Sequence, residues 1–383
     1  MYKPIIYSIE NILHNKNIDA DERIAEIKKI ITEQQAYKNQ TDKDSKSLID
    51  LFKTNLETIE NDTLESKLIS SGYTDLDRLI SGFGMGELIV VGARPAMGKT
   101  TLLVNLVLKI SLDHPVLFFS YDLSESSFIS RIISNISLIP SDRIINNKLD
   151  ATEKDILKNI EPSLNRHQVY INETYSNSMV DFRLHCEKMI SEKGVKVVFV
   201  DYIQMMSSNK FGSRRELEIS YISRELKRLA KELNICVVAT SQLSRAVEQR
   251  GGDKKPMLSD LRESGSIEQD ADKVIFVYRP EYYGFLQDED GNSTLNLMQL
   301  LVAKNRNGLI GEVDLICNFS RSDISAILDH NNPLNNLTSS ANGFNFSKDR
   351  LNEINNDSRE FDDDHDVDNF RTEKHEDDQD TPF

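Results

Sequence analysis

The chain has 383 residues, 39% of them hydrophobic and 28% charged, which suits a soluble protein with one large domain and appendages or with two domains. No apolar stretch approaches the ~20 residues of a membrane span, and Met1–Pro4 lacks the start of a signal peptide, so we expect a cytoplasmic protein with no membrane partner. The net charge of −16 would ordinarily argue against a nucleic-acid partner. Much of this charge lies in Asp357–Phe383, which holds twelve acidic and three basic residues, so a nucleic-acid surface elsewhere on the chain remains possible.

The first segment predicts helices without a domain of their own. Ile5–Leu13 and Ile24–Ile31 have helical spacing but too little apolar surface, so residues 1–44 are expected to form a short helical N-terminal extension. A linker helix from about Ser47 to Glu60, with its connector, occupies residues 45–71. Its apolar stripe must be buried either in its own domain or against a neighbouring subunit.

Strand-like runs alternate with helical patterns from Gly72 to about Ile327, which predicts an α/β domain over residues 72–328 with a mostly parallel sheet flanked by helices. Beyond Asp329 the composition turns to Asn, Ser, Asp and Glu, and residues 329–383 are expected to be a disordered acidic tail. The predicted strands are Leu88–Val91, Val116–Phe119, Val169–Ile171, Val197–Val200, Cys236–Ala239, Val274–Val277, Leu297–Val302 and Val313–Ile316. The three cysteines lack Cys-x-x-Cys spacing, which predicts core thiols in place of a zinc site or disulfides.

A phosphate-binding loop is the strongest chemical signal. It follows the first predicted strand and precedes a helical pattern, and one glycine of the strict pattern is replaced by alanine. In such a loop backbone N–H groups surround the phosphates, Lys99 reaches the β- and γ-phosphates, and Thr100 ligates Mg²⁺, so we expect a nucleoside triphosphate and Mg²⁺ as cofactors. The expected nucleotide-binding residues are Ala93, Arg94, Pro95, Ala96, Met97, Gly98, Lys99, Thr100 and Thr101.

Three further residues are candidates at the ends of predicted strands. Asp201 ends an apolar strand and is expected on the Mg²⁺ side, although many strands end in Asp as a turn residue. Asp122 follows the next strand after the loop and could reach a water that attacks the γ-phosphate, or it could cap a helix. Gln242 could sense the γ-phosphate through its neutral amide.

Lys304 and Arg306 lie at i and i+2 before a Gly turn, and this spacing places both cations on one side of a hairpin. From the spacing alone, we expect Lys304 and Arg306 to be solvent-exposed surface cations without a catalytic role.

The motifs together resemble the ATPase domain of DnaB-type replicative helicases, over about Gly72 to Phe319. The phrases that match, in order, are Ala93–Thr100, Val200–Gln204, Ser223–Lys227, Ser241–Arg245, Ser259–Asp272 and Ala303–Gly308. The fourteen-residue phrase Ser259–Asp272 favours this family over other RecA-like ATPases. The resemblance implies a RecA-like P-loop fold and a ring, expected to be a hexamer, which hydrolyses ATP, translocates on single-stranded DNA and unwinds duplex during replication, 5′ to 3′ by family analogy.

The resemblance also implies residue roles. Lys304 and Arg306 match cations that reach the γ-phosphate bound by the neighbouring subunit. Arg262, Glu263 and Gly265 match the channel loop that follows the DNA backbone. A primase or a loader is a further possible partner, and Asp122 stands where the family has a water-activating glutamate.

Two departures keep other functions open. Asp122 is one methylene shorter than glutamate, and only about seventy residues precede the core where the family has a helical domain. The alternatives are a nucleotide-gated DNA-binding or assembly platform with weak ATPase activity, and a recombination ATPase of the RecA or RadA type. The acidic tip ending in Pro382-Phe383 resembles that of bacterial single-strand DNA-binding proteins, which predicts docking to a replication protein or a merely solubilising tail.

Overall fold

The computed structural model describes residues 12–13, 19, 22–24, 26–28, 30, 47–60, 68–172, 176–208, 211, 214–261 and 265–327. The predicted acidic tail and its Pro-Phe tip lie outside these residues, as do Arg262 and Glu263 of the predicted DNA loop. Within the predicted N-terminal extension, the described residues at 12–13 and between 22 and 30 are helical, inside or overlapping the two short helices expected there.

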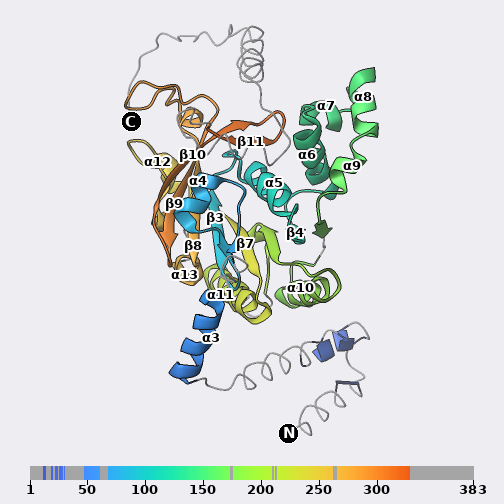
Figure 1. Cartoon of the computed structure of the whole chain (residues 1–383), viewed down its shortest axis with the longest axis vertical. Helices are drawn as coiled ribbons and strands as arrows, with labels where there is room; N and C mark the ends of the chain where they lie inside the picture. Colours follow the sequence, from blue (N-terminus) through green and yellow to red (C-terminus); the bar gives the residue numbers. More distant parts are fainter. Residues whose placement is uncertain are drawn as a thin grey trace, which may run out of the picture. The chain divides into compact units, whose positions relative to one another are not determined.

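A nine-stranded sheet forms the centre of the fold, in the order β11-β10-β9-β8-β3-β7-β6-β4-β5 (Figure 1). The six strands from β8 to β5 are parallel, and β9, β10 and β11 extend the sheet antiparallel. All eight predicted strands are present, and β11 and the small pair β1–β2 are additional. The strands are β1 Leu68–Ile69, β2 Phe83–Gly84, β3 Leu88–Ala93, β4 Val116–Ser120, β5 Val169–Asn172, β6 Val197–Asp201, β7 Cys236–Gln242, β8 Lys273–Tyr278, β9 Leu297–Asn305, β10 Gly311–Asn318 and β11 Asp323–Ala326.

Helices connect the strands, and none in the described part of the chain is long and apolar enough to cross a membrane. The predicted linker helix is α3, which exposes Leu48, Ile49, Phe52 and Leu56. The helices are α3 Leu48–Glu60, α4 Thr74–Ile80, α5 Lys99–Ile110, α6 Glu125–Ser137, α7 Ser141–Ile145, α8 Ala151–Lys158, α9 Glu161–Leu164, α10 Met179–Lys193, α11 Arg215–Leu233, α12 Ala246–Gln249 and α13 Gly265–Asp270, with short 3₁₀ turns at Ile203–Met205, Leu258–Asp260 and Glu281–Tyr283.

Strand β3 is buried on both faces, which explains its unbroken apolar sequence. Ile89 and Val91 belong to a core that includes residues of α4, α5 and α6, whereas Leu88 and Val90 belong to a core formed with α10, α11 and α13 (Figure 1). Because successive side chains of a strand point to opposite faces, this one strand joins both helix layers. Its carboxyl end therefore lies on a rigid edge.

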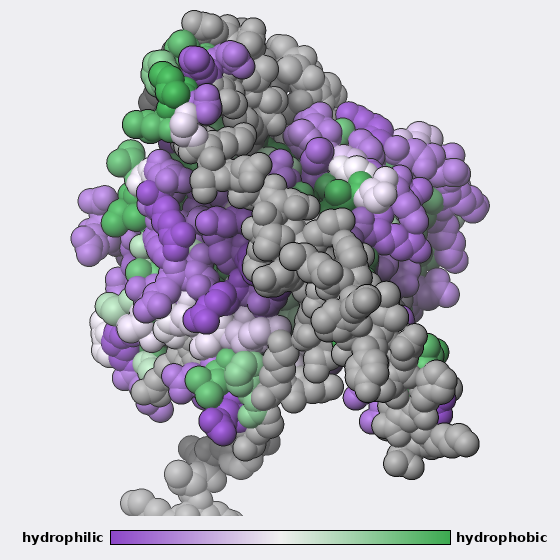
Figure 2. Space-filling model, turned by 90° about the horizontal axis from the view of Figure 1, so that it is seen from below, coloured by the Kyte–Doolittle hydropathy of each residue, from purple (hydrophilic) through white to green (hydrophobic). Residues whose placement is uncertain are grey.

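The described part of one face of the molecule is mostly hydrophilic (Figure 2). Figure 2 shows a face on which hydrophobic residues form small groups among hydrophilic ones. Scattered exposed apolar residues are normal for a folded domain.

Helix α5 is held to the distant strand β11 by a buried amide. Asn105 donates to the carbonyls of Thr101 and Ser322, both at 2.8 Å, and its Oδ1 accepts from the Ile324 N–H at 3.0 Å. The side chain is 3% exposed, so it replaces water for these backbone groups. Asn105 thus fixes the helix that begins with Lys99.

We predict that Asn105→Ala destabilises the domain by about 2–3 kcal/mol, because the buried Ile324 N–H loses its acceptor and the Ser322 carbonyl keeps only its bond from Asn135. Thermal unfolding monitored by circular dichroism measures this loss. Asn159→Ala is the matched control, since Asn159 is exposed and donates to the Asp155 carbonyl at 2.8 Å. Equal melting temperatures for the two variants would contradict the anchoring role.

Candidate functional site

The phosphate-binding loop joins β3 to α5 at the carboxyl edge of the sheet. Ala93 ends β3 and pairs with Gln242 of β7. Gly98 precedes α5 with φ of 88°, and a Cβ there would lie 2.6 Å from Cε1 of Phe319. Both the backbone angle and the close contact therefore require glycine. The first N–H groups of the twelve-residue helix α5 are directed at this loop, as a phosphate site requires.

The carboxylate of Asp201 is the centre of the site. Asp201 ends β6, is 1% exposed, and accepts from the Thr240 hydroxyl at 2.6 Å. Lys99 Nζ lies 3.0 Å from its Oδ1, and the Thr100 hydroxyl lies 3.1 Å from its Oδ2. Residues from three elements, α5, β6 and β7, thus meet at one buried negative charge.

The aromatic ring of Tyr202 packs against the ammonium group of Lys99. Lys99 Nζ lies 4.4 Å from the centre of the Tyr202 ring, within the range of a cation–π contact. Burial raises the pKa of the Tyr202 phenol, and the charges of Asp122 and Asp201 raise it further. The phenol therefore stays neutral at physiological pH. Because the charge of Asp122 acts on the Tyr202 phenol, Asp122 lies near this part of the site.

Asp122 and Gln242 are exposed at the same edge. Ser120 of β4 pairs with Asp201 of β6, and the Tyr121 N–H donates to the Asp201 carbonyl at 3.0 Å, so Asp122 lies two residues beyond the end of β4, beside the strand that ends in Asp201. Strands β6 and β7 separate β4 from the loop strand β3. Gln242 donates its N–H to Oε1 of Gln204 at 3.2 Å, which positions its backbone beside Ala93.

Throughout the loop, which the structure describes in full, the side chains other than those of Lys99 and Thr100 make no hydrogen bond or ion pair with Asp201, so these residues can contribute to the site mainly through their backbone groups. Arg94 is 7% exposed and turns away from Asp201, with Nη1 2.7 Å from the Leu243 carbonyl and Nε 2.9 Å from Glu248. Met97 and Thr101 are buried, whereas Pro95 and Ala96 form the exposed tip of the loop. Arg94 therefore anchors the loop to the segment after β7, a role that the sequence pattern does not reveal.

Lys304 and Arg306 converge on α13 at the opposite edge of the sheet. Lys304 Nζ donates to the carbonyls of Glu268 and Gln269, and Arg306 donates to the carbonyl of Gln269 and pairs with Asp272 at 3.3 Å. They lie on one side of the hairpin, as the spacing predicts. Burial and the neighbouring Arg306 lower the pKa of Lys304.

The strand register separates these cations from their own loop. The Arg306 N–H donates to Asp272, whose N–H donates to Leu88 at the start of β3, while the loop follows Ala93 at its end. Five strand steps span about 16 Å. That distance exceeds the reach of an arginine side chain, so Arg306 cannot serve the phosphate site of its own subunit.

Of the predicted DNA loop, Gly265 is described. It is the exposed first residue of α13. The helix that follows the predicted DNA loop is therefore the helix whose last carbonyls hold Lys304 and Arg306.

The donors suit Mg²⁺ more than a transition metal. The described residues contain no cluster of three or more His, Cys, Asp or Glu that could hold an ion. One carboxylate and one hydroxyl, Asp201 and Thr100, fit an ion that keeps waters and takes phosphate oxygens as its other ligands. Lys99 beside them offers a positive charge to the same phosphates.

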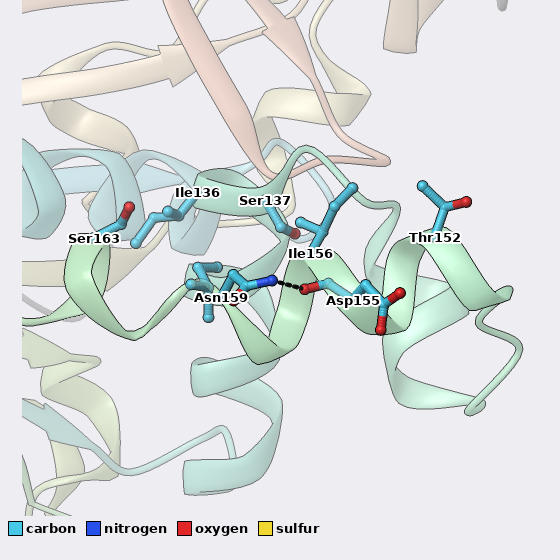
Figure 3. Close-up of a pocket in the computed structure, with 8 residues that line it drawn as sticks. Ile136, Ser137, Thr152, Asp155, Ile156, Asn159 and Ser163 are labelled. Atoms are coloured by element: carbon cyan, nitrogen blue, oxygen red, sulfur yellow. Dashed lines mark hydrogen bonds between the residues drawn. The ribbon is translucent and has the colours of Figure 1, made fainter.

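A separate hollow lies between α6, α8 and α9 (Figure 3). Its volume is about 460 Å³, and it is lined by Ile136, Ser137, Thr152, Asp155, Ile156, Asn159, Ile160 and Ser163. None of the predicted site residues lines it. The hollow is therefore distinct from the phosphate site.

Comparison with known proteins assigns the family. Residues 69–324 match the model of the DnaB-like helicase C terminal domain, and the chain belongs to this family of RecA-like ATPase domains. It is 39% identical over 264 residues to the replicative DNA helicase DnaB of Geobacillus stearothermophilus, covering 68% of this chain and 57% of that protein. With the replicative DNA helicase DnaC of Bacillus subtilis it shares 34% identity over 306 residues, or 79% and 66% of the two chains.

Two solved structures agree. One, described as an ATPase domain, has a TM-score of 0.67 at 31% identity, covering 74% of this chain and all of that one. A DnaB-like replicative helicase, described with its primase interactions, has a TM-score of 0.69 at 28% identity, covering 85% and 76%. The chain spans 57% to 66% of the length of the two curated relatives named above.

Sequence reasoning missed the roles of Thr240 and Tyr202. Thr240 directly precedes the motif Ser241–Arg245 and Tyr202 lies within the motif Val200–Gln204, but hydrophobic periodicity assigns neither residue a function. The strand register would have found Thr240, because Val200 pairs with Ala239 and places Asp201 and Thr240 at the same level. Sequence alone does not give the strand order.

We predict that Thr240→Val weakens Mg²⁺-dependent nucleotide binding by about 10- to 100-fold, because the Asp201 carboxylate loses the donor that orients it. Titration of a fluorescent ATP analogue at several Mg²⁺ concentrations measures the effect. Thr152→Val, on exposed α8, is the control. Unchanged Mg²⁺ dependence in Thr240→Val would show that Asp201 needs no such support.

Proposed function

We propose that this protein is an ATP-dependent replicative DNA helicase, which assembles as a ring, expected to be a hexamer, and translocates on single-stranded DNA to unwind duplex, 5′ to 3′. The observation that carries the proposal is the division of the catalytic groups between opposite edges of one sheet. Lys99, Thr100 and Asp201 occupy the carboxyl edge, and Lys304 and Arg306 the other. A complete ATP site then needs two subunits.

In the proposed reaction Lys99 binds the β- and γ-phosphates, and Thr100 and Asp201 hold Mg²⁺ directly or through water. Mg²⁺ supplies neutralisation of the phosphate charge. Asp122 orients or deprotonates the attacking water, and Gln242 responds to the loss of the γ-phosphate. Lys304 and Arg306 of the neighbouring subunit stabilise the charge that develops on the transferred phosphoryl group.

DNA binding is proposed for Arg262, Glu263 and Gly265. Main-chain N–H groups on such a loop can follow a phosphate backbone, and an acidic chain can hold DNA this way. The exposed apolar stripe of α3 supports assembly, because Leu48, at 85% exposure, and Phe52, at 57%, require cover that a neighbouring subunit can provide. A primase or loader, and a replication protein at the Pro-Phe tip, are further proposed partners.

We predict that Arg306→Ala lowers DNA-stimulated ATP turnover by a factor on the order of 10³ to 10⁵, while each subunit still binds ATP, because the lost charge acts only on the transition state of the neighbour. Phosphate release and analogue binding measure the two effects separately. Arg78→Ala removes an exposed cation that pairs with Asp75 and serves as the control. Full turnover in Arg306→Ala would rule out the trans role.

A nucleotide-gated assembly platform with weak ATPase activity is the second candidate, and the shorter Asp122 favours it. A base must come within ~2.6–3.2 Å of the proton it takes, or act through one water, and Asp reaches less far than Glu. Its exposed position at the end of β4 allows the loop to approach.

DNA-stimulated phosphate release by the wild type and by Asp122→Glu separates the two candidates. We predict strong turnover in the wild type, with Asp122→Glu changing it little. Turnover that becomes strong only after the substitution would favour the platform. Asp113→Glu, in the exposed turn after α5 and at the other end of that helix from the loop, controls for the added methylene.

A further inference from the structure

Asp272 lies directly behind the proposed trans cations and is fixed in place by its backbone. Its N–H donates to the Leu88 carbonyl at 2.8 Å, and its side chain is 9% exposed. One carboxylate oxygen, Oδ2, accepts from the Leu88 N–H at 2.8 Å and from Lys227 Nζ at 2.5 Å. Lys227 belongs to α11 and is 13% exposed, so this charge is already compensated inside the protein.

The second oxygen of Asp272 faces Arg306. Arg306 Nη1 lies 3.3 Å from Oδ1, the longest of the contacts that this carboxylate makes. The guanidinium is 42% exposed, whereas the Arg306 backbone N–H is bound to the Asp272 carbonyl at 2.9 Å. The backbone of Arg306 is therefore held firmly, whereas its half-exposed guanidinium is held at its inner side by Asp272 and by the Gln269 carbonyl.

This arrangement suits a side chain that must leave its partner. When Arg306 moves to a triphosphate, Asp272 keeps Lys227 and the Leu88 N–H, so no buried charge is left without a partner. The adjacent pair of Lys273 and Glu87 differs in exposure, because Lys273 is 3% exposed and Glu87 13%, whereas Arg306 is 42% exposed.

The carbonyl end of α13 completes the support. Glu268 and Gln269 accept from Lys304, and Gln269 also accepts from Arg306. Cations are favoured at the carboxyl end of a helix, where carbonyls lack partners within the helix. Both cations are thus held at one end of α13, beside Asp272.

We propose that Asp272 is a positioning residue for catalysis in trans: it holds Arg306 ready on its own subunit and releases the guanidinium to the triphosphate of the neighbour, with Lys227 compensating the carboxylate. The inference rests on the proposed trans role of Arg306. It assigns Asp272 no contact with ATP. Loss of the carboxylate leaves Arg306 in the protein but unaligned.

The test is steady-state phosphate release by the full chain with Mg·ATP and oligo-dT. Asp272→Asn is expected to lower kcat by about 10- to 100-fold, as misplacement of a catalytic group does, with the KM for ATP within about twofold of the wild type. Glu87→Gln breaks the neighbouring buried pair without touching Arg306 and should keep the wild-type kcat. Equal kcat values for Asp272→Asn and the wild type would overturn the proposal.

Co-assembly with Lys99→Ala subunits separates positioning from general damage. Lys99→Ala disables the phosphate loop but supplies intact Asp272 and Arg306 to a neighbour. The mixture should release phosphate faster than either variant alone. No gain on mixing would show that Asp272→Asn harms its own nucleotide site, and would overturn the proposal.

Lys227→Met tests the same arrangement if Asp272→Asn does not fold. Without its compensating lysine, Asp272 should hold Arg306 more tightly, so kcat should fall and recover on co-assembly with Lys99→Ala. A wild-type kcat in Lys227→Met would contradict the proposal. Full activity of Arg306→Ala would instead reject the trans role itself, whereas loss in Arg306→Ala with normal Asp272→Asn and Lys227→Met would reject only the positioning role.

Discussion

The organisation of this domain depends on one buried carboxylate at the end of a central strand. Asp201 is almost fully enclosed, and three donors from α5 and β7 converge on it. A charge in that position is tolerable only when it is paired and hydrogen-bonded. The strand order β3-β7-β6 achieves this, because it brings the phosphate loop and Thr240 to the same edge as Asp201. The rigid two-layer packing around β3 fixes that edge, and Asn105 fixes the helix that follows the loop.

The same sheet explains why the proposed ATP site would be incomplete in one subunit. A parallel strand has two ends, and the functional groups are divided between them. The loop, Asp201 and Asp122 stand at one edge, while Lys304, Arg306 and Asp272 stand at the other. Strand length sets their separation at a distance that side chains cannot cross within a subunit. In the proposed ring, two subunits would bring the opposite edges together, and the family to which the chain belongs is consistent with this arrangement.

Much of this could be predicted from the sequence. The buried parallel strands appear as unbroken apolar runs, and the loop has a motif that few other structures require, so the fold class and the places of Lys99, Thr100 and Asp201 follow from local pattern. Contacts between distant segments do not. The turn of Arg94 toward Glu248, the cation–π contact of Lys99 with Tyr202, and the Lys227–Asp272–Arg306 group depend on strand order and helix packing. Strand β11 escapes prediction because Asp323–Ala326 is short and only partly apolar.

The central claim is that ATP chemistry is shared between neighbouring subunits, and complementation between two inactive variants tests it most directly. Lys99→Ala lacks the phosphate-loop cation, and Arg306→Ala lacks the cation of the opposite edge. Each should be inactive alone, whereas co-assembled subunits contain some interfaces with both groups intact. The account predicts that the mixture regains DNA-stimulated phosphate release. A mixture that remains as inactive as its components, despite joint assembly, would contradict it.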